Sequence, residues 1–218
     1  NLRPEGKQGA LVRSLSSHMS YYGRWAHSWE FQALLKARAI AGDPELGAEY
    51  EAAVQPLVWS SAARENFVES VQRMRERVTD NIPADEIARQ VKLGPGGIRD
   101  IEFTVQLLQL VHGLSDPDIR QRGTLAALDA LVAEGYIGRV EAGAFARDYR
   151  QLRVLEHRLQ LRQLRRTHLM PARPEDLRVL ARATGLADNG DALVERWEAI
   201  KREVRDIHVR LFYRPLLS

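Results

Sequence analysis

The segment at residues 92–97 has the composition of a loop that binds anions. Three of its residues are glycines around one proline, and an apolar helix is predicted to begin directly after it. Glycine lets the backbone approach another group closely, and the first turn of a helix presents N–H groups that lack helical partners. We therefore predict that Lys92, Gly96, Gly97 and Arg99 form an edge that binds phosphate or carboxylate. The alternative is an ordinary turn at the start of a helix.

Two further cations, Lys36 and Arg38, lie among apolar residues. If residues 29–41 form one helix, a helical wheel places Arg38 beside Phe31 and Lys36 beside Trp29. A buried charge needs a partner, so both side chains would point at a cleft that holds an anion. The alternative is that each stem follows the apolar surface while its charged end reaches water.

Polar stripes on two predicted helices provide carboxylates that could orient these cations. The stripes consist of Arg99, Glu102, Gln106 and Gln109 on one helix and of Arg153, Glu156 and Gln160 on the other. If they face each other, they form a buried network that fixes the register of the two helices. We predict orienting roles for Asp100, Glu102 and Glu156, and Asp100 could also cap its own helix.

The sequence offers no convincing catalytic or metal-binding set. The pair Asp116 and Asp118 resembles a metal-binding D-x-D motif, but Pro117 separates the two residues and no apolar strand follows. A surface turn capped by aspartate explains this segment better. We predict no catalytic residue and no metal ligand in the chain.

Apolar residues recur at steps of three and four along most of the chain, which predicts an all-α fold. Helices are expected over residues 67–78 (capped by Ser60 or Ser61), 124–131 (ended by Gly135), 145–159, 174–184 and 191–212. Only the first 15 residues and residues 87–93 could hold strands. We predict a multi-helix bundle over residues 44–218 that follows a largely non-helical remnant of another domain at residues 1–43.

Composition narrows the functional classes. The 218 residues include 32 Lys and Arg against 29 Asp and Glu, with 44% hydrophobic residues and no cysteine. Nothing approaches a membrane span, and the absence of cysteine suits a reducing cytoplasm. Apart from a short basic cluster at residues 158–166, no run of positive charge favours nucleic acid. The chain starts without methionine, which suggests a fragment.

Several segments together resemble the glutamine synthetase adenylyltransferase family. They are residues 1–6 with 9–12, Trp29-Glu30, residues 35–38 with Gly42-Asp43, residues 92–103 with Val105-Gln106, and residues 152–160 with Thr167-His168 and Pro171. The run from Gly96 to Phe103 is the most specific of them. The resemblance implies a tandem enzyme, in which one half attaches AMP to a tyrosine of glutamine synthetase and the other half removes it by phosphorolysis.

The resemblance implies a role for this chain. It is more similar to the half that removes AMP and forms ADP, and the metal-binding aspartates of that half would precede Asn1. The chain alone would then be inactive, and Mg²⁺ would be held outside it. Phosphate or nucleotide contacts, with ATP or ADP as the nucleotide, are expected from Arg3, Lys36 and Arg38.

The implied partners are glutamine synthetase and a nitrogen-signalling regulatory protein. Two alternatives remain open. One is a helical docking module that binds either of these proteins without handling a nucleotide. The other is the related helical domain of a uridylyltransferase.

Overall fold

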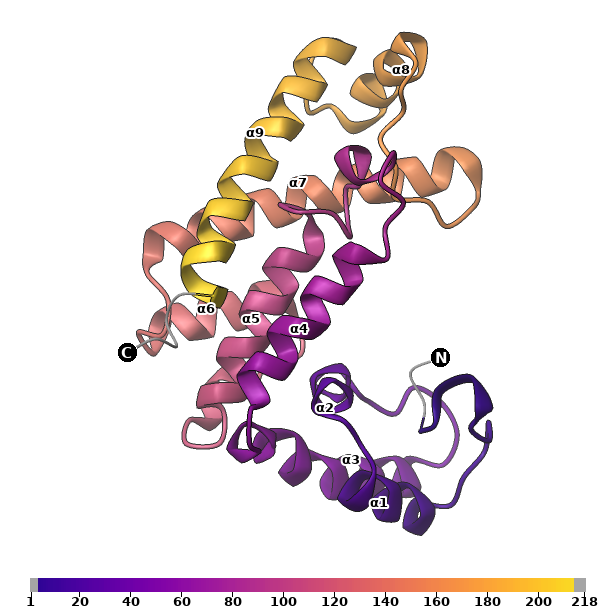
Figure 1. Ribbon diagram of the computed structural model, residues 1–218, viewed down its shortest axis with the longest axis vertical. Coiled ribbons are helices and arrows are strands. Elements are labelled where there is room, and N and C mark those ends of the chain that lie inside the picture. Colours follow the sequence, from indigo (N-terminus) through magenta and orange to yellow (C-terminus); the bar gives the residue numbers. More distant parts are fainter. Residues whose placement is uncertain (1–3, 214–218) are drawn as a thin grey trace. The chain divides into compact units, whose positions relative to one another are not determined.

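The computed structural model describes residues 4–213 and, apart from the side chain of Gln163, their side chains. These residues form nine α-helices, five short helical turns and no β-strand, which confirms the all-α prediction (Figure 1). The α-helices are α1 (Leu15–Arg24), α2 (Ser28–Leu34), α3 (Pro44–Trp59), α4 (Phe67–Asp80), α5 (Ile98–His112), α6 (Thr124–Ala133), α7 (Arg139–Gln163), α8 (Pro174–Thr184) and α9 (Gly190–His208). Within the described residues, no helix is both long and apolar enough to span a membrane.

The chain divides into two compact units. Unit 1 contains residues 1–74 and 106–130, and unit 2 contains residues 75–105 and 131–218. This division follows contacts within the chain and does not test the predicted domain boundary after residue 43, which stays a prediction.

Unit 1 is built around α3, which packs against both α1 and α2. The carboxylate of Asp43 accepts the N–H groups of Glu45 and Leu46 at 2.8 and 3.3 Å, and Pro44 occupies the first helical position. Both features are typical of a helix start, because Pro has no N–H to leave unpaired and Asp satisfies those that follow. Phe31, Val54 and Val58 are buried in the core of this unit.

Unit 2 is built around α7, α8 and α9, with α9 packed against the other two (Figure 1). The predicted apolar stripe of α9 is buried as expected, from Leu193 to Ile207. Helix α8 begins at Pro174 and ends at Gly185, whose φ of 65° lies in the left-handed region that glycine adopts easily. Both ends of α8 were therefore predicted correctly.

Four local predictions were wrong. The remnant at residues 1–43 was expected to be largely non-helical, but it contains α1 and α2, because residues 15–24 and 28–34 form helices that pack on α3. Ser60 ends α3 and Ser61 begins a 3₁₀ turn, so neither caps α4. Residues 87–93 contain the 3₁₀ turn Ile87–Arg89 and one isolated bridge between Gln90 and Leu169 in place of a strand. The helix expected over residues 29–41 ends at Leu34, which changes the positions of Lys36 and Arg38.

Candidate functional site

The non-helical segment that follows α2 is held to α3 by a hydrogen bond. The carboxylate of Glu51 on α3 accepts the backbone N–H of Ala39 at 2.8 Å, and Gly42 has a φ of 97°. An N–H bound by a side chain is not available to a helical carbonyl, so residues 38–42 leave the helix. That hydrogen bond and the Arg122 guanidinium hold the pKa of Glu51 below its usual range.

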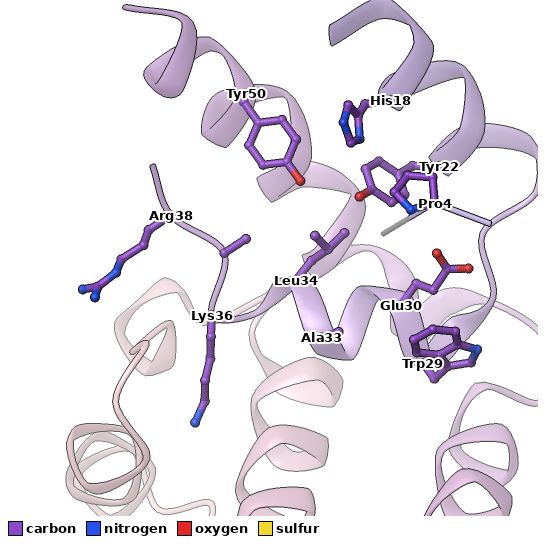
Figure 2. Close-up of a pocket in the computed structure, with 11 residues that line it drawn as sticks. Pro4, His18, Tyr22, Trp29, Glu30, Ala33, Leu34, Lys36, Arg38 and Tyr50 are labelled. Atoms are coloured by element: carbon purple, nitrogen blue, oxygen red, sulfur yellow. The ribbon is translucent and has the colours of Figure 1, made fainter. Parts of the chain in front are cut away.

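This non-helical segment forms one wall of a hollow in unit 1, which we call the aromatic pocket. The pocket has a volume of about 340 Å³, and its lining includes His18, Tyr22, Trp29, Lys36, Arg38 and Tyr50. Figure 2 shows these side chains, which come from α1, α2, the segment after α2, and α3.

The aromatic side of the pocket is rigid and uncharged. The His18 ring meets the Tyr50 ring edge-on with centroids 5.6 Å apart, and the Tyr50 and Tyr22 hydroxyls face each other (Figure 2). Burial, followed by the hydrogen bond with Tyr50, raises the pKa of Tyr22 well above its usual value. Burial and the charge of Arg13 lower the pKa of His18, so its ring is neutral at pH 7.

The carboxylate of Glu30, on the pocket wall, already accepts two hydrogen bonds within the chain. Glu30 is buried, and its Oε1 accepts the Tyr21 hydroxyl and the His27 backbone N–H, each at 3.0 Å. The second bond is part of the capping box at the start of α2. Glu30 therefore orders the wall of the pocket.

Lys36 and Arg38 bring positive charge to the rim of the aromatic pocket. Both side chains are exposed, and in Figure 2 their charged ends point away from Tyr22 and Tyr50. The Lys36 ammonium donates to the Thr124 hydroxyl at 3.1 Å. The two cations thus share one hollow as predicted, but they reach water and are not buried. A ligand that contacts both the aromatic wall and the cations needs a planar part and an anionic part.

The glycine-rich loop belongs to unit 2, and its backbone donors are occupied within the chain. Gly96 N–H donates to Asp100 Oδ2 at 2.7 Å, Gly97 N–H to the Gly94 carbonyl at 3.1 Å, and Arg99 N–H to the Lys92 carbonyl at 3.0 Å. These bonds would have to open before the loop could bind an anion. The glycines serve close packing instead.

That packing is tightest at Gly96. A Cβ atom on Gly96 would lie 2.1 Å from the Lys201 carbonyl oxygen on α9, and its φ is 75°. The backbone approach that the glycine pattern predicted is therefore an approach to α9.

Asp100 joins the loop to a buried ion pair that the sequence analysis missed. Arg75 donates through Nε to Asp100 Oδ1 at 2.7 Å, and its side chain is only 2% exposed. Arg75 also donates to the Thr79 hydroxyl at 2.6 Å and to the Gly94 carbonyl at 3.3 Å. The sequence did contain a signal, because Arg75 follows Val71 by four residues on the apolar face of α4.

Histidine 208 completes this cluster. Its Nδ1 lies 2.8 Å from the Thr104 hydroxyl, which itself donates to the Asp100 backbone carbonyl, and its Nε2 lies 3.5 Å from Asp100 Oδ1. Burial lowers the pKa of His208 to about 4, although the nearby Asp100 carboxylate acts in the opposite direction. The ring is neutral at pH 7, so Arg75 carries the charge that faces Asp100.

Glu156 on α7 is a second paired carboxylate of unit 2. It accepts Lys92 at 2.8 Å and Arg153 at 2.6 Å, and its side chain is 2% exposed. Burial raises the pKa of Glu156, but the hydrogen bond and charge of Lys92, with the charge of Arg153, bring it below the usual value. Glu156 thus contacts Lys92 directly, and its orienting role at a binding cleft stays a prediction.

The remaining predicted residues have separate surroundings. Arg99 pairs with Glu102 at 2.8 Å, and the Tyr149 hydroxyl of α7 donates to Glu102 at 3.4 Å. The expected pairing of the two polar stripes stays a prediction. In unit 1, Gln106 accepts from Gln32 at 2.8 Å. Arg3 lies outside the described residues. Lys36 and Arg38 belong to unit 1, whereas Lys92, Gly96, Gly97 and Arg99 belong to unit 2.

No metal centre can be built from the described residues. In residues 4–213 no group of three or more His, Asp or Glu side chains could hold a metal ion. Asp116 accepts the backbone N–H of Asp118 at 3.0 Å and caps a 3₁₀ turn, which confirms the predicted surface turn. The residues present do not fit a magnesium site.

Two family models match the chain in succession. Residues 66–212 match the model described as GlnD PII-uridylyltransferase, and residues 1–53 match the model described as Glutamate-ammonia ligase adenylyltransferase. The first match covers most of unit 2 and most of the predicted helical bundle, whereas the second contains Lys36 and Arg38.

Relatives that match over the whole chain show which family is involved. A bifunctional glutamine synthetase adenylyltransferase/adenylyl-removing enzyme of Leifsonia xyli subsp. xyli is 68% identical over 218 residues, and one of Streptomyces coelicolor is 60% identical over 219 residues. The chain belongs to the family of bifunctional glutamine synthetase adenylyltransferase/adenylyl-removing enzymes, and residues 66–212 belong to the family described as GlnD PII-uridylyltransferase. It spans 22% of the length of each of these two relatives.

Proposed function

We propose that this chain is part of an enzyme that regulates glutamine synthetase by attaching AMP to a tyrosine and removing it. Identity of 68% over the entire chain to an enzyme with both activities in its name supports this proposal. The match to the adenylyltransferase model covers residues 1–53, which include most of the lining of the aromatic pocket. We assign the chain to the half that removes AMP by phosphorolysis and releases ADP.

The observation that carries the proposal is the pairing of an aromatic hollow with two cations at its rim. The planar side chains of Trp29 and Tyr50 offer surfaces on which a purine can stack, and Lys36 and Arg38 can neutralise phosphate oxygens. Phosphoryl and nucleotidyl transfer depends mainly on positioning and on neutralising developing charge. Lys36 and Arg38 are therefore proposed as contacts to the phosphates of ADP or ATP.

The remaining components of the reaction are proposed to lie outside this chain. The described residues do not fit a magnesium site, so any Mg²⁺ would be held by other parts of the longer enzyme, and the chain alone would be inactive. We propose glutamine synthetase as the protein substrate, a nitrogen-signalling protein as regulator, and the cytoplasm as the location.

A test replaces Lys36 with alanine in the longer enzyme and measures phosphorolytic removal of AMP from adenylylated glutamine synthetase. We expect the rate to fall about tenfold or more, because one charge-assisted contact to the phosphates is lost. The unfolding midpoint of the Lys36→Ala variant should stay unchanged, because the side chain is exposed. A rate within about twofold of the unmodified enzyme would contradict the assignment.

A matched pair of arginine variants controls for the loss of charge alone. Arg38 lines the aromatic pocket, whereas Arg24, in the last turn of α1, is exposed and does not line it. Arg38→Gln should slow the removal of AMP, and Arg24→Gln should leave the rate unchanged. Equal effects of the two substitutions would show that only the overall charge of unit 1 matters.

A further inference from the structure

Unit 2 contains a second hollow, which we call the arginine hollow. It has a volume of about 290 Å³, and four arginines line it: Arg89, Arg162, Arg165 and Arg173. They come from three segments, namely the 3₁₀ turn before the glycine-rich loop, the end of α7 with the residues after it, and the N-cap of α8. The charges therefore converge from different parts of unit 2.

The wall between these segments is held by backbone hydrogen bonds. Met170 N–H donates to the Arg89 carbonyl at 2.9 Å, and Val91 N–H donates to the His168 carbonyl at 2.8 Å. The guanidinium of Arg89 in turn donates to the Met170 carbonyl at 3.3 Å. These backbone hydrogen bonds fix the position of Arg89 relative to the segment that leads into α8.

One carboxylate, that of Asp176, is present among the residues that line the hollow. It accepts the Arg162 guanidinium and, at 2.9 Å, Nε of Arg173. These hydrogen bonds, Arg162 first, hold the pKa of Asp176 below its usual range despite an opposing contribution from burial. Because one aspartate faces four arginines, the hollow keeps a clear excess of positive charge.

Asp176 also orients the arginines without using up their donors. A guanidinium has five N–H groups in a planar fork, which matches two oxygens of a phosphate or carboxylate. Like charges that converge on one hollow repel one another, and a bound anion removes this repulsion. The residues that line this hollow include no aromatic ring, in contrast to the aromatic pocket, so it lacks a surface for a nucleobase.

We propose that the arginine hollow binds a small, multiply charged oxyanion. Two sources share this chemistry, namely a phosphate-type anion and a small dicarboxylate. None of the residues that line it is among the proposed nucleotide contacts.

The test titrates the 218-residue chain with sodium pyrophosphate and, separately, with sodium malonate in a calorimeter at constant ionic strength. The titrations use a Lys36→Ala, Arg38→Ala background, which removes the rim cations of the aromatic pocket. We expect one anion per chain at the arginine hollow. Tighter binding of pyrophosphate would identify a phosphate-type ligand, and tighter binding of malonate would identify a dicarboxylate. No binding of either anion would overturn the proposal.

Arginine variants on this background locate the site. Arg162→Gln and Arg165→Gln remove lining charges, whereas Arg158→Gln removes an exposed arginine one turn earlier on α7 that does not line the hollow. Each lining variant should weaken binding of the tighter anion about tenfold, and Arg158→Gln by less than about twofold. An equal loss from all three would show diffuse attraction and overturn the proposal. Circular dichroism should show unchanged helix content, because all three side chains lie near the surface.

Discussion

The buried Arg75 of unit 2 and the exposed Arg38 and Lys36 of unit 1 show two ways in which this chain uses a cation beside apolar residues. Arg75 donates to a carboxylate, a hydroxyl and a carbonyl of its own chain, and its side chain is only 2% exposed. Lys36 and Arg38 lie at the rim of a hollow and keep access to water. Position among apolar residues therefore does not by itself identify a ligand contact.

The comparison predicts effects of very different size when either cation is substituted. Arg75→Met leaves the Asp100 carboxylate buried without its main partner, which costs about 3–5 kcal/mol. Lys36→Ala should change the free energy of unfolding by less than about 0.5 kcal/mol, because its charged end is exposed. Urea denaturation followed by circular dichroism measures both. Similar losses for the two variants would remove the distinction drawn between them.

The same cluster predicts a pH dependence of stability. His208 has a pKa of about 4 in the folded chain, mainly because it is buried, whereas in the unfolded chain its pKa is about 6.5. Below pH 6.5 the unfolded state binds a proton that the folded state does not, so stability falls between pH 6.5 and 4. One pKa unit corresponds to about 1.4 kcal/mol, which gives a total loss of about 3 kcal/mol.

Other groups around His208 also contribute charge, so a variant must isolate its part. Asp100, Arg75 and Arg205 face the ring. In His208→Gln the amide can still bond to the Thr104 hydroxyl but does not titrate in this range. Its free energy of unfolding should therefore fall less steeply from pH 6.5 to 4 than that of the unmodified chain. Parallel curves would show that another group causes the loss.

The glycine-rich loop supplies the next comparison. Gly96→Ala places a Cβ atom against the Lys201 carbonyl at a φ of 75°, and we expect a loss of about 2 kcal/mol or more. Gly143, inside α7, has open space around its Cβ position. Gly143→Ala should stabilise the chain by about 0.5–1 kcal/mol, because alanine favours a helix more than glycine does. Thermal unfolding of both variants checks the opposite signs.

Much of the fold could be predicted because the apolar periodicity of α9 and the end signals of α8 act locally. Pro174 and Gly185 restrict the backbone whatever surrounds them, so the boundaries followed from the sequence. The course of the segment after α2 could not be predicted in this way, because Ala39 in that segment is bound by Glu51 of α3. A contact between distant residues leaves no local pattern.

The candidate site could also be predicted only in part, because some of its contacts join residues that are distant in the sequence. Lys36 and Arg38 were predicted because cations are uncommon among apolar residues, and both side chains line the aromatic pocket. The aromatic wall was missed, since Tyr22 and Tyr50 come from different helices and their spacing in the sequence predicts no contact. The glycine-rich loop was predicted to approach another group closely and to bind an anion, but no sequence pattern shows that the group it approaches is the backbone of α9.

The smallest expected effect concerns the hydroxyl that positions Lys36. Thr124→Val keeps the shape of the side chain but removes the acceptor 3.1 Å from the Lys36 ammonium. Because that ammonium is exposed, water replaces the hydroxyl, and the free energy of unfolding should change by less than about 1 kcal/mol. ADP binding to the chain should weaken about twofold to threefold, since Lys36 loses orientation but keeps its charge. A loss of stability as large as that expected for Arg75→Met would instead place Lys36 among the cations that hold the fold together.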